Sequence, residues 1–272
     1  MINSVNINSL TTSRGWRPSN IKSMLHLLTL TSLLASGIAF SSATTLTSED
    51  EKSGSLPLPN SFSAEYLLQS GFFDIGITER SLRLQKNGDY SFTSITHATG
   101  MFAIFYNGKV TERSVWKYHE GRARPLHYSY KDTNKKKERE VNLAFDWENR
   151  TVTNTINGEP WDMEITPDTQ DKLIYQINIM LSLLENSNPK IMVINVADGG
   201  KLKSYDAIIQ GKETIETPAG EFEVVRVNRD DGKRVTTLWC APELNYLPVR
   251  IEHYKKGDTK VNAYLTKVNG LP

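Results

Sequence analysis

Short runs of alternating apolar and polar residues, separated by turn dipeptides, dominate the sequence from Ser61 onward. In one such run Val141, Leu143, Phe145 and Trp147 fall on one side of an extended chain, which is typical of a strand with one buried face. The pairs between runs combine Asn or Asp with Gly, residues that suit tight hairpin turns: Asn87-Gly88, Asn107-Gly108, Asn157-Gly158, Asp198-Gly199 and Asp231-Gly232. About a dozen such runs predict a large antiparallel meander that curls or closes on itself.

One segment, PDTQDKLIYQINIMLSLLENSNP at residues 167–189, breaks this period. Its apolar residues repeat at helical spacing and form one stripe: Leu173, Ile174, Ile177, Met180, Leu181 and Leu184. Asp168 is the expected N-cap, with Asp171 three residues further on. A second apolar row, Tyr175, Ile179 and Leu183, makes the face wider than packing on one sheet requires. Either the helix is sandwiched within the protein, or this second row borders a ligand cavity.

These patterns predict a mainly β protein, a curved antiparallel meander or half-barrel of about a dozen strands with one long amphipathic helix. No repeat of fixed period is visible, so residues 61–268 are interpreted as a single β-rich domain. Residues 44–60 are polar and rich in proline, which indicates a flexible leader before it.

The first 43 residues resemble a secretory signal peptide. Arg14, Arg17 and Lys22 precede an apolar run from Met24 to Phe40, and small residues follow it up to Ala43. The run is near the short limit for a membrane span and is diluted by Ser, Thr and Gly. We therefore expect an exported protein in the periplasm, without a transmembrane anchor after cleavage.

Charge and cysteine content exclude two classes of protein. Cleavage after residue 43 would remove three of 32 basic residues and none of the 31 acidic ones, which leaves a nearly neutral chain. General nucleic-acid binding requires a clear excess of basic charge, so no nucleic-acid partner is expected. The single cysteine, Cys240, allows no internal disulfide, so the fold is expected to depend on its hydrophobic core.

Cys240 and His253 form the one pair that suggests catalysis. They lie 13 residues apart, so a hairpin could bring thiol and imidazole together as in a cysteine hydrolase. No glycine-rich oxyanion loop accompanies them, and Ala241-Pro242 indicates a strand that ends in a turn. A structural cysteine is therefore the favoured interpretation, and no catalytic residue is assigned.

No recognised cofactor or metal motif is present. The four histidines after residue 43 are scattered, without HxH or HxxxH spacing: His97, His119, His127 and His253. The chain has no GxSxG motif, P-loop or GxGxxG loop in a strand-to-helix context. No cofactor and no metal are expected.

Two C-terminal segments carry a family resemblance. TIETPAGEFEVVRVNR (214–229) and TTLWCAPELNYLPVRIEHYKKGD (236–258) resemble the bacterial family known as domain of unknown function 3108. The shared residues occur together in one order: Trp239, Ala241, Pro242, Leu247, Pro248 and Arg250. FDIG (73–76), FDW (145–147) and PDTQD (167–171) are also similar to that family, so the resemblance covers roughly residues 60–268.

This resemblance implies an exported, mostly β protein of the bacterial envelope with no established activity. It also implies that the position of Cys240 is variable in the family, which disfavours a nucleophile there. The expected fold is comparable to the half-barrel of periplasmic lipoprotein carriers, in which a helix plugs a curved sheet. That comparison is an analogy of fold.

Three hypotheses for function follow. The first is a non-enzymatic periplasmic protein that binds a lipid or other apolar molecule between sheet and helix, beside Tyr175, Ile179 and Leu183. The second is a module that binds another envelope protein through a strand edge or through the aromatic residues Phe102, Phe105 and Tyr106. The third, least favoured, is a hydrolase that uses Cys240 and His253.

Overall fold

The computed structural model describes residues 55–134, 138–186, 190–230, 232–255 and 260–272. All described residues belong to one compact unit within Asp50–Pro272. The signal peptide predicted over residues 1–43 and most of the leader predicted over 44–60 lie outside the described residues. Both stay predictions.

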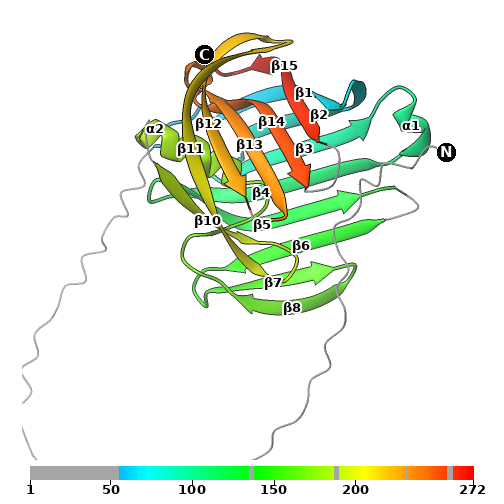
Figure 1. Cartoon of the computed structure of the whole chain (residues 1–272). Coiled ribbons are helices and arrows are strands. Elements are labelled where there is room, and N and C mark those ends of the chain that lie inside the picture. The colour runs from blue at the N-terminus through cyan, green and yellow to red at the C-terminus, as the bar shows by residue number, and fades with distance from the viewer. Residues whose placement is uncertain (1–54, 135–137, 187–189, 231, 256–259) are drawn as a thin grey trace, which may run out of the picture. The chain divides into compact units, whose positions relative to one another are not determined.

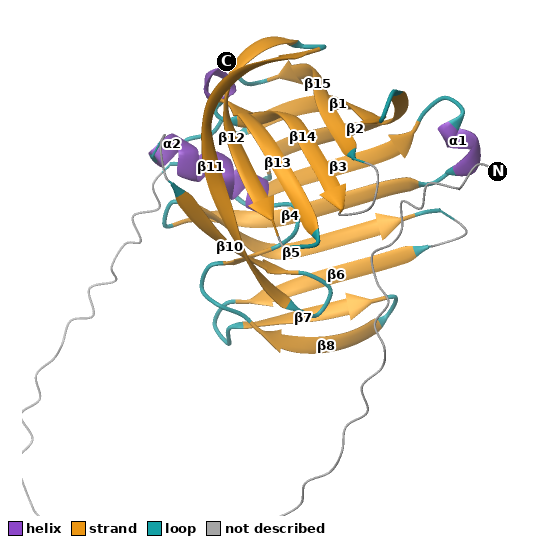
Figure 2. Cartoon of the chain, in the orientation of Figure 1, coloured by secondary structure: helices purple, strands orange, loops and turns teal. Residues whose placement is uncertain are grey.

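The described residues form mainly β-structure (Figures 1 and 2). The strands before the longer helix are β1 (Ser61–Ser70), β2 (Phe73–Leu84), β3 (Tyr90–Ala98), β4 (Lys109–His119), β5 (Arg122–Asp132), β6 (Arg139–Asp146), β7 (Thr151–Ile156), β8 (Glu159–Glu164) and β9 (Thr169–Gln170). The strands after it are β10 (Ile191–Ala197), β11 (Leu202–Thr217), β12 (Gly220–Asp230), β13 (Arg234–Ala241), β14 (Leu247–Lys255) and β15 (Val261–Asn269). The helices are α1 (Phe102–Phe105), α2 (Tyr175–Glu185) and the 3-10 turn η1 (Pro242–Leu244). The prediction of a mainly β fold is confirmed, with fifteen strands in place of about a dozen.

All fifteen strands belong to one sheet, in the order β8-β7-β6-β5-β4-β3-β2-β1-β15-β14-β13-β12-β11-β10-β9. Strands that follow each other in the sequence pair with each other, except β8 and β9, and the first and last strands, β1 and β15, pair in the middle of the sheet. All pairs are antiparallel except the short parallel pair β9–β10. The sheet is therefore a meander whose two edges come from the middle of the chain.

The link between β8 and β9 forces the sheet to curl. These strands are the opposite edges, yet only residues 165–168 separate them. Fifteen strands laid flat would span about 67 Å, whereas this link reaches at most about 18 Å. The turn between β10 and β11 also bridges the edges, because the Gly200 N–H donates to Asn154 Oδ1 of β7 at 3.1 Å. A Cβ on Gly200 would lie 2.5 Å from the Trp161 ring of β8, so only glycine allows this approach.

The alternating pattern places side chains as predicted in β6. Val141, Leu143 and Phe145 are buried, whereas Asn142 and Ala144 are exposed. The turn after β7 also follows the sequence, because Asn157 and Gly158 both have positive φ, as a tight hairpin requires. In β6 the local sequence therefore determines which face points inward.

Helix α2 lies inside the curl. Eight of its eleven residues are buried, including Tyr175, Ile179 and Leu183 at 5% exposure or less. Both polar atoms of the Asn178 side-chain amide are hydrogen-bonded: Oδ1 accepts from the Ala123 N–H at 2.7 Å, and Nδ2 donates to the Ala123 carbonyl at 2.9 Å. A helix buried on nearly all sides needs apolar residues around its whole circumference, which accounts for the second apolar row. Binding of a ligand by that row stays a prediction.

The start of α2 differs from the prediction. Asp168 was the expected N-cap, but Thr169 and Gln170 pair with β10 as a strand, and the helix begins at Tyr175. Asp168 instead accepts a hydrogen bond from Asn195 Nδ2 at 2.6 Å. Asp171 takes the capping role in the turn before the helix, since its Oδ1 accepts from the Leu173 and Ile174 N–H groups, both at 2.8 Å. Pairing with a strand distant in sequence therefore displaces the helix start.

Removal of side-chain volume at Leu183 tests whether the second row is core. Leu183 is fully buried and its neighbour Leu184 is only partly buried. We expect Leu183→Ala to lower the free energy of unfolding by about 2–5 kcal/mol, and Leu184→Ala by clearly less. Urea denaturation followed by circular dichroism measures both. A loss below about 1 kcal/mol for Leu183→Ala would mean that this residue does not pack in a closed core.

Candidate functional site

The C-terminal motif folds as a strand, a turn and a second strand. β13 ends at Ala241, η1 turns the chain, and β14 begins at Leu247. Asn245 and Tyr246 both have positive φ, and the Tyr246 N–H donates to the Ala241 carbonyl at 2.8 Å, which closes the turn. This arrangement agrees with the interpretation of Ala241-Pro242 as the end of a strand.

The structure does not bring Cys240 and His253 together. Cys240 lies opposite Pro248, whereas His253 lies opposite Thr236, four residues away along β13. Four strand residues correspond to about 13 Å, far more than one bridging water spans. Burial also raises the pKa of the Cys240 thiol well above its ordinary value, so the thiolate is disfavoured. The Cys240–His253 hydrolase hypothesis is therefore wrong.

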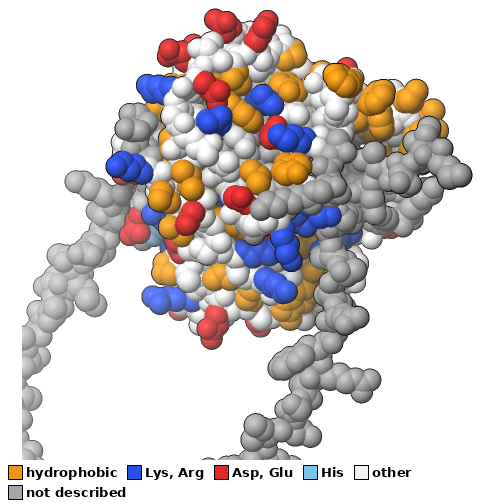
Figure 3. All heavy atoms as spheres, in the orientation of Figure 1, with side chains coloured by type: hydrophobic (Ala, Val, Ile, Leu, Met, Phe, Trp, Pro, Cys, Tyr) orange, Lys and Arg blue, Asp and Glu red, His pale blue; other side chains and the backbone are white. Residues whose placement is uncertain are grey.

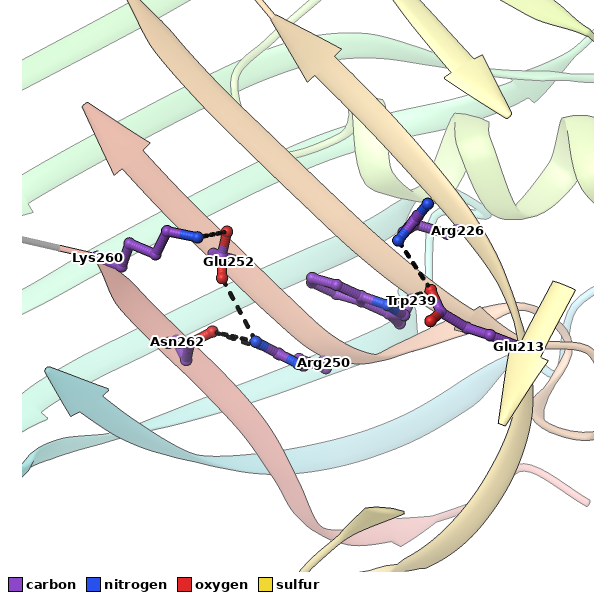
Figure 4. A network of polar contacts seen from close by, with 7 residues as sticks. All are labelled: Glu213, Arg226, Trp239, Arg250, Glu252, Lys260 and Asn262. Atoms are coloured by element: carbon purple, nitrogen blue, oxygen red, sulfur yellow. Dashed lines mark hydrogen bonds and ion pairs between the residues drawn. The ribbon is translucent and has the colours of Figure 1, made fainter. Parts of the chain in front are cut away.

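The family motif residues Trp239 and Arg250 form a cross-strand pair on the outer face (Figure 4). The Arg250 guanidinium lies over the Trp239 ring, 4.3 Å from its centroid. The indole N–H of Trp239 donates to Glu213 Oε1 at 2.9 Å. On the other side, Arg250 donates to Asn262 Oδ1 at 3.0 Å. These contacts tie β11, β13, β14 and β15 together, which gives both residues a structural role.

The pocket that borders α2 is polar. It has a volume of about 300 Å³ and reaches α2 only at Asn178. Charged side chains on its wall include Glu120, Arg122, Arg124 and Asp168. It does not open onto Tyr175, Ile179 or Leu183, so it offers no apolar cavity beside the second helical row.

Large apolar side chains gather on the surface at one end of the sheet. They come from the β1–β2 turn, the start of β2 and the region of α1, and each is at least 63% exposed: Phe72, Phe73, Met101, Ile104 and Phe105. We call this set the α1 patch. Figure 3 shows hydrophobic side chains at the upper right, where Figure 1 places α1. Scattered apolar residues are ordinary on protein surfaces, whereas large apolar side chains gathered in one place are typical of interaction sites.

Two of the three aromatic residues predicted to bind a partner, Phe102 and Tyr106, make other contacts. Phe102 is half-buried and packs against Phe73 beneath the α1 patch, with ring centroids 6.3 Å apart. Tyr106 turns away, because its hydroxyl donates to Asp132 Oδ1 at 2.7 Å. Phe105 alone of the predicted trio belongs to the exposed set. Phe72 and Phe73 were not predicted as site residues, although two adjacent phenylalanines interrupt the alternation of apolar and polar residues.

Within the described ranges, no group of three or more His, Cys, Asp or Glu side chains has the arrangement of a metal site. No helix among the described residues is long and apolar enough to cross a membrane.

Asp171 and His253 have displaced pKa values that lie between about 4 and 6. Burial raises the pKa of Asp171 to about 6, although Ser114 Oγ donates to its carboxylate at 2.6 Å. Burial and the nearby Arg229, Arg80 and Arg234 lower the pKa of His253 to about 4. His253 is an exposed residue, so solvent screens part of this effect, and its Nδ1 lies 2.9 Å from Thr236 Oγ1.

These two groups are expected to act oppositely on stability between pH 4 and pH 6. The raised pKa of Asp171 means that the folded state binds its proton more tightly than the unfolded state. The contribution of Asp171 to the free energy of unfolding therefore falls, on the order of 3 kcal/mol, as the pH rises from 3.8 to 6. The lowered pKa of His253 means that the folded state binds its proton less tightly, so this group gains stability between pH 4 and 6.5.

Single variants separate the two contributions. Relative to wild type, Asp171→Asn should make the free energy of unfolding rise more steeply with pH, and His253→Gln should make it fall more steeply. Urea denaturation at half-unit steps from pH 4 to pH 7 measures both slopes. The assignment fails if the two variants change the slope in the same direction.

Cys240 offers a simpler test of its structural role. Because its thiol is fully buried, we expect no reaction with a thiol reagent in the folded protein and one equivalent after denaturation. Absorbance at the wavelength of the released thiolate measures both. Rapid labelling of the folded protein would contradict burial and reopen a reactive role.

Comparisons with known proteins identify a family and a fold. The chain is similar to the crystal structure of a beta-barrel-like protein of domain of unknown function DUF1849 from Brucella abortus, with a TM-score of 0.56 and 13% identity, covering 79% of this chain and 99% of that chain. At this identity the likeness shows the fold alone. No curated protein matches the chain. A family model described as "Protein of unknown function (DUF3108)" matches residues 63–266. Because this match spans most of the chain, as the C-terminal motifs predicted, the protein belongs to the DUF3108 family.

Proposed function

We propose that the protein acts by binding a partner protein in the bacterial envelope and not by catalysis. The α1 patch carries this proposal, because five large apolar side chains are exposed together at one end of the sheet. Partner binding would remove this surface from water, at roughly 25 cal/mol for each Å² buried. The envelope location depends on the signal peptide predicted over residues 1–43.

The strand edges suit this role less well. The edge strand β8 has the sequence EPWDME, which carries three acidic residues and a proline. Charges and proline on an edge oppose addition of another strand. The other edge strand, β9, is only two residues long. Of the two docking surfaces that the sequence suggested, the aromatic one therefore has the stronger support.

A protein partner fits the α1 patch better than a membrane surface. The two segments that form the patch, residues 71–75 and 99–106, contain no lysine or arginine. Peripheral binding to anionic membranes usually adds basic side chains to an apolar anchor. Aromatic residues and methionine without flanking basic residues are instead typical of the centre of a protein interface.

Lipid carriage between sheet and helix, the first hypothesis from the sequence, has less support. Tyr175, Ile179 and Leu183 are buried, and the pocket beside α2 is lined by charged groups. A lipid chain would have to displace the helix to reach them.

Site-directed photocrosslinking tests the proposed partner surface. A photoreactive residue at Phe72 or at Phe105 should give the same discrete adduct in cells. The matched control is the same residue at Glu148, an exposed position in the β6–β7 turn, which should give none. Once the adduct is identified, Ile104→Ser should weaken its binding about tenfold or more, since a central apolar anchor contributes at least about 1–2 kcal/mol.

Two results would contradict this function. One is the absence of any adduct specific to positions 72 and 105. The other is flotation of the wild-type protein with liposomes and its loss in Ile104→Ser, which would assign the α1 patch to a lipid surface. Because Ile104 is exposed, its substitution should change stability by less than about 0.5 kcal/mol, so misfolding does not confuse the comparison.

A further inference from the structure

A row of polar residues crosses the inner face of the sheet beside α2. Arg229 of β12 lies opposite Thr236 of β13, and Thr236 lies opposite His253 of β14. Arg234 is two residues from Thr236 on the same strand, so it shares that face. The row belongs to the inward side, since the next residues on that side, Val227, Leu238 and Ile251, are core.

A second arginine reaches the same place from the other half of the sheet. Arg80 lies on β2, and its guanidinium donates to Gln176 Oε1 of α2 at 2.5 Å. The neighbouring helix residue, Tyr175, lies against Arg229, with 5.1 Å from guanidinium carbon to ring centroid. The first turn of α2 therefore holds Arg80 and Arg229 near each other, although 149 positions separate them in the sequence.

The Arg229 guanidinium contacts two aromatic rings and no hydrogen-bond acceptor among the described residues. Its guanidinium lies 4.3 Å from the Tyr205 centroid as well as against Tyr175. Among the described residues, no carboxylate or other acceptor is hydrogen-bonded to it. Stacking on a ring uses the face of the guanidinium and leaves the N–H groups at its edge available. Arg80 also keeps an unused donor, since its Nε is buried without a partner.

The charged groups that act on the His253 ring are all basic. The charged groups that lower the pKa of His253 are Arg229, Arg80 and Arg234. A half-buried guanidinium group without a counter-ion, such as that of Arg229, is costly, because burial removes water and each like charge repels the next. Stacking alone does not offset this repulsion, whereas a bound anion would.

We propose that Arg229, Arg80 and His253 form a binding site for an oxyanion group, a phosphate or a carboxylate. The edge of Arg229 and the unused donor of Arg80 supply N–H groups, and the neutral His253 ring carries one further N–H. Because most apolar side chains of α2 are buried, we assign the site to the charged group of the ligand. That group belongs either to a free small anion or to the head of an amphiphile. The site is separate from the α1 patch, so it does not depend on the proposed function.

Isothermal titration calorimetry tests binding with four probes: inorganic phosphate, acetate, dodecyl phosphate and dodecanoate below its micellar concentration. We expect at least one phosphate or carboxylate probe to bind the wild type with one site per chain. Similar affinity for short and long probes identifies a free anion, whereas binding of the dodecyl probes alone identifies an amphiphile head.

Two substitutions on β12 distinguish loss of the binding site from a general loss of positive charge. Arg229→Gln should weaken binding about tenfold to hundredfold, the usual effect of losing hydrogen bonds from a charged donor. Arg226→Gln is the matched control: it lies on the same strand but on the outer face, opposite Trp239 and 3.4 Å from Glu213. It removes the same charge and should change affinity less than twofold.

Two further readouts keep the test decisive. Arg229→Lys retains the positive charge but loses the planar guanidinium edge. It should bind the anion more weakly than wild type, and a difference in net charge cannot be the cause. A bound anion should raise the pKa of His253 by about one unit, which is followed by NMR of its ring protons and assigned with His253→Gln. The inference is overturned by equal binding in Arg229→Gln and Arg226→Gln, by no binding of any probe, or by an unchanged His253 titration.

Discussion

The short link between β8 and β9 is the constraint on which the rest of the structure depends. Because four residues join the two edges of a fifteen-stranded sheet, the sheet has to curl until its edges approach. Curling creates an inside, and the inside of a sheet this large cannot be filled by strand side chains alone. Helix α2 fills it, and it follows directly on the strand that forms the edge. Closure and filling are therefore consequences of one stretch of chain, residues 165–185.

The inner face divides into an apolar part and a polar part around this helix. Apolar side chains surround most of α2, whereas its first turn meets Arg80 and Arg229. The outer face behaves differently: Trp239, Arg250 and their partners connect β11 to β15 without leaving a charge unpaired (Figure 4). Arginines on the two faces of β12 and β14 thus have different environments. Those outside are neutralised by neighbours, and Arg229 inside is not.

Much of the fold could be predicted because adjacent residues of a strand alternate between apolar and polar. The alternation in β6 and the positive-φ turn at Asn157-Gly158 were readable from adjacent residues. The hairpin of Trp239 to Arg250 was readable too, because Pro242 and Pro248 restrict the backbone. The helix start was misplaced, since pairing of Thr169 and Gln170 with β10 involves residues more than twenty positions away. The candidate sites were predicted less well, because exposure of Phe72 and proximity of Arg80 to Arg229 depend on packing.

The sequence by itself determined the β class, the family, the inward face of strands such as β6 and the presence of one largely apolar helix. These properties follow from periodicity and from backbone preferences, which act over a few residues. Only the tertiary structure decided that β1 pairs with β15, that α2 is enclosed, that Cys240 and His253 lie apart, and that basic groups from both halves of the sheet meet. Such contacts arise when distant segments share one curved sheet, and no local pattern records the register that brings them together.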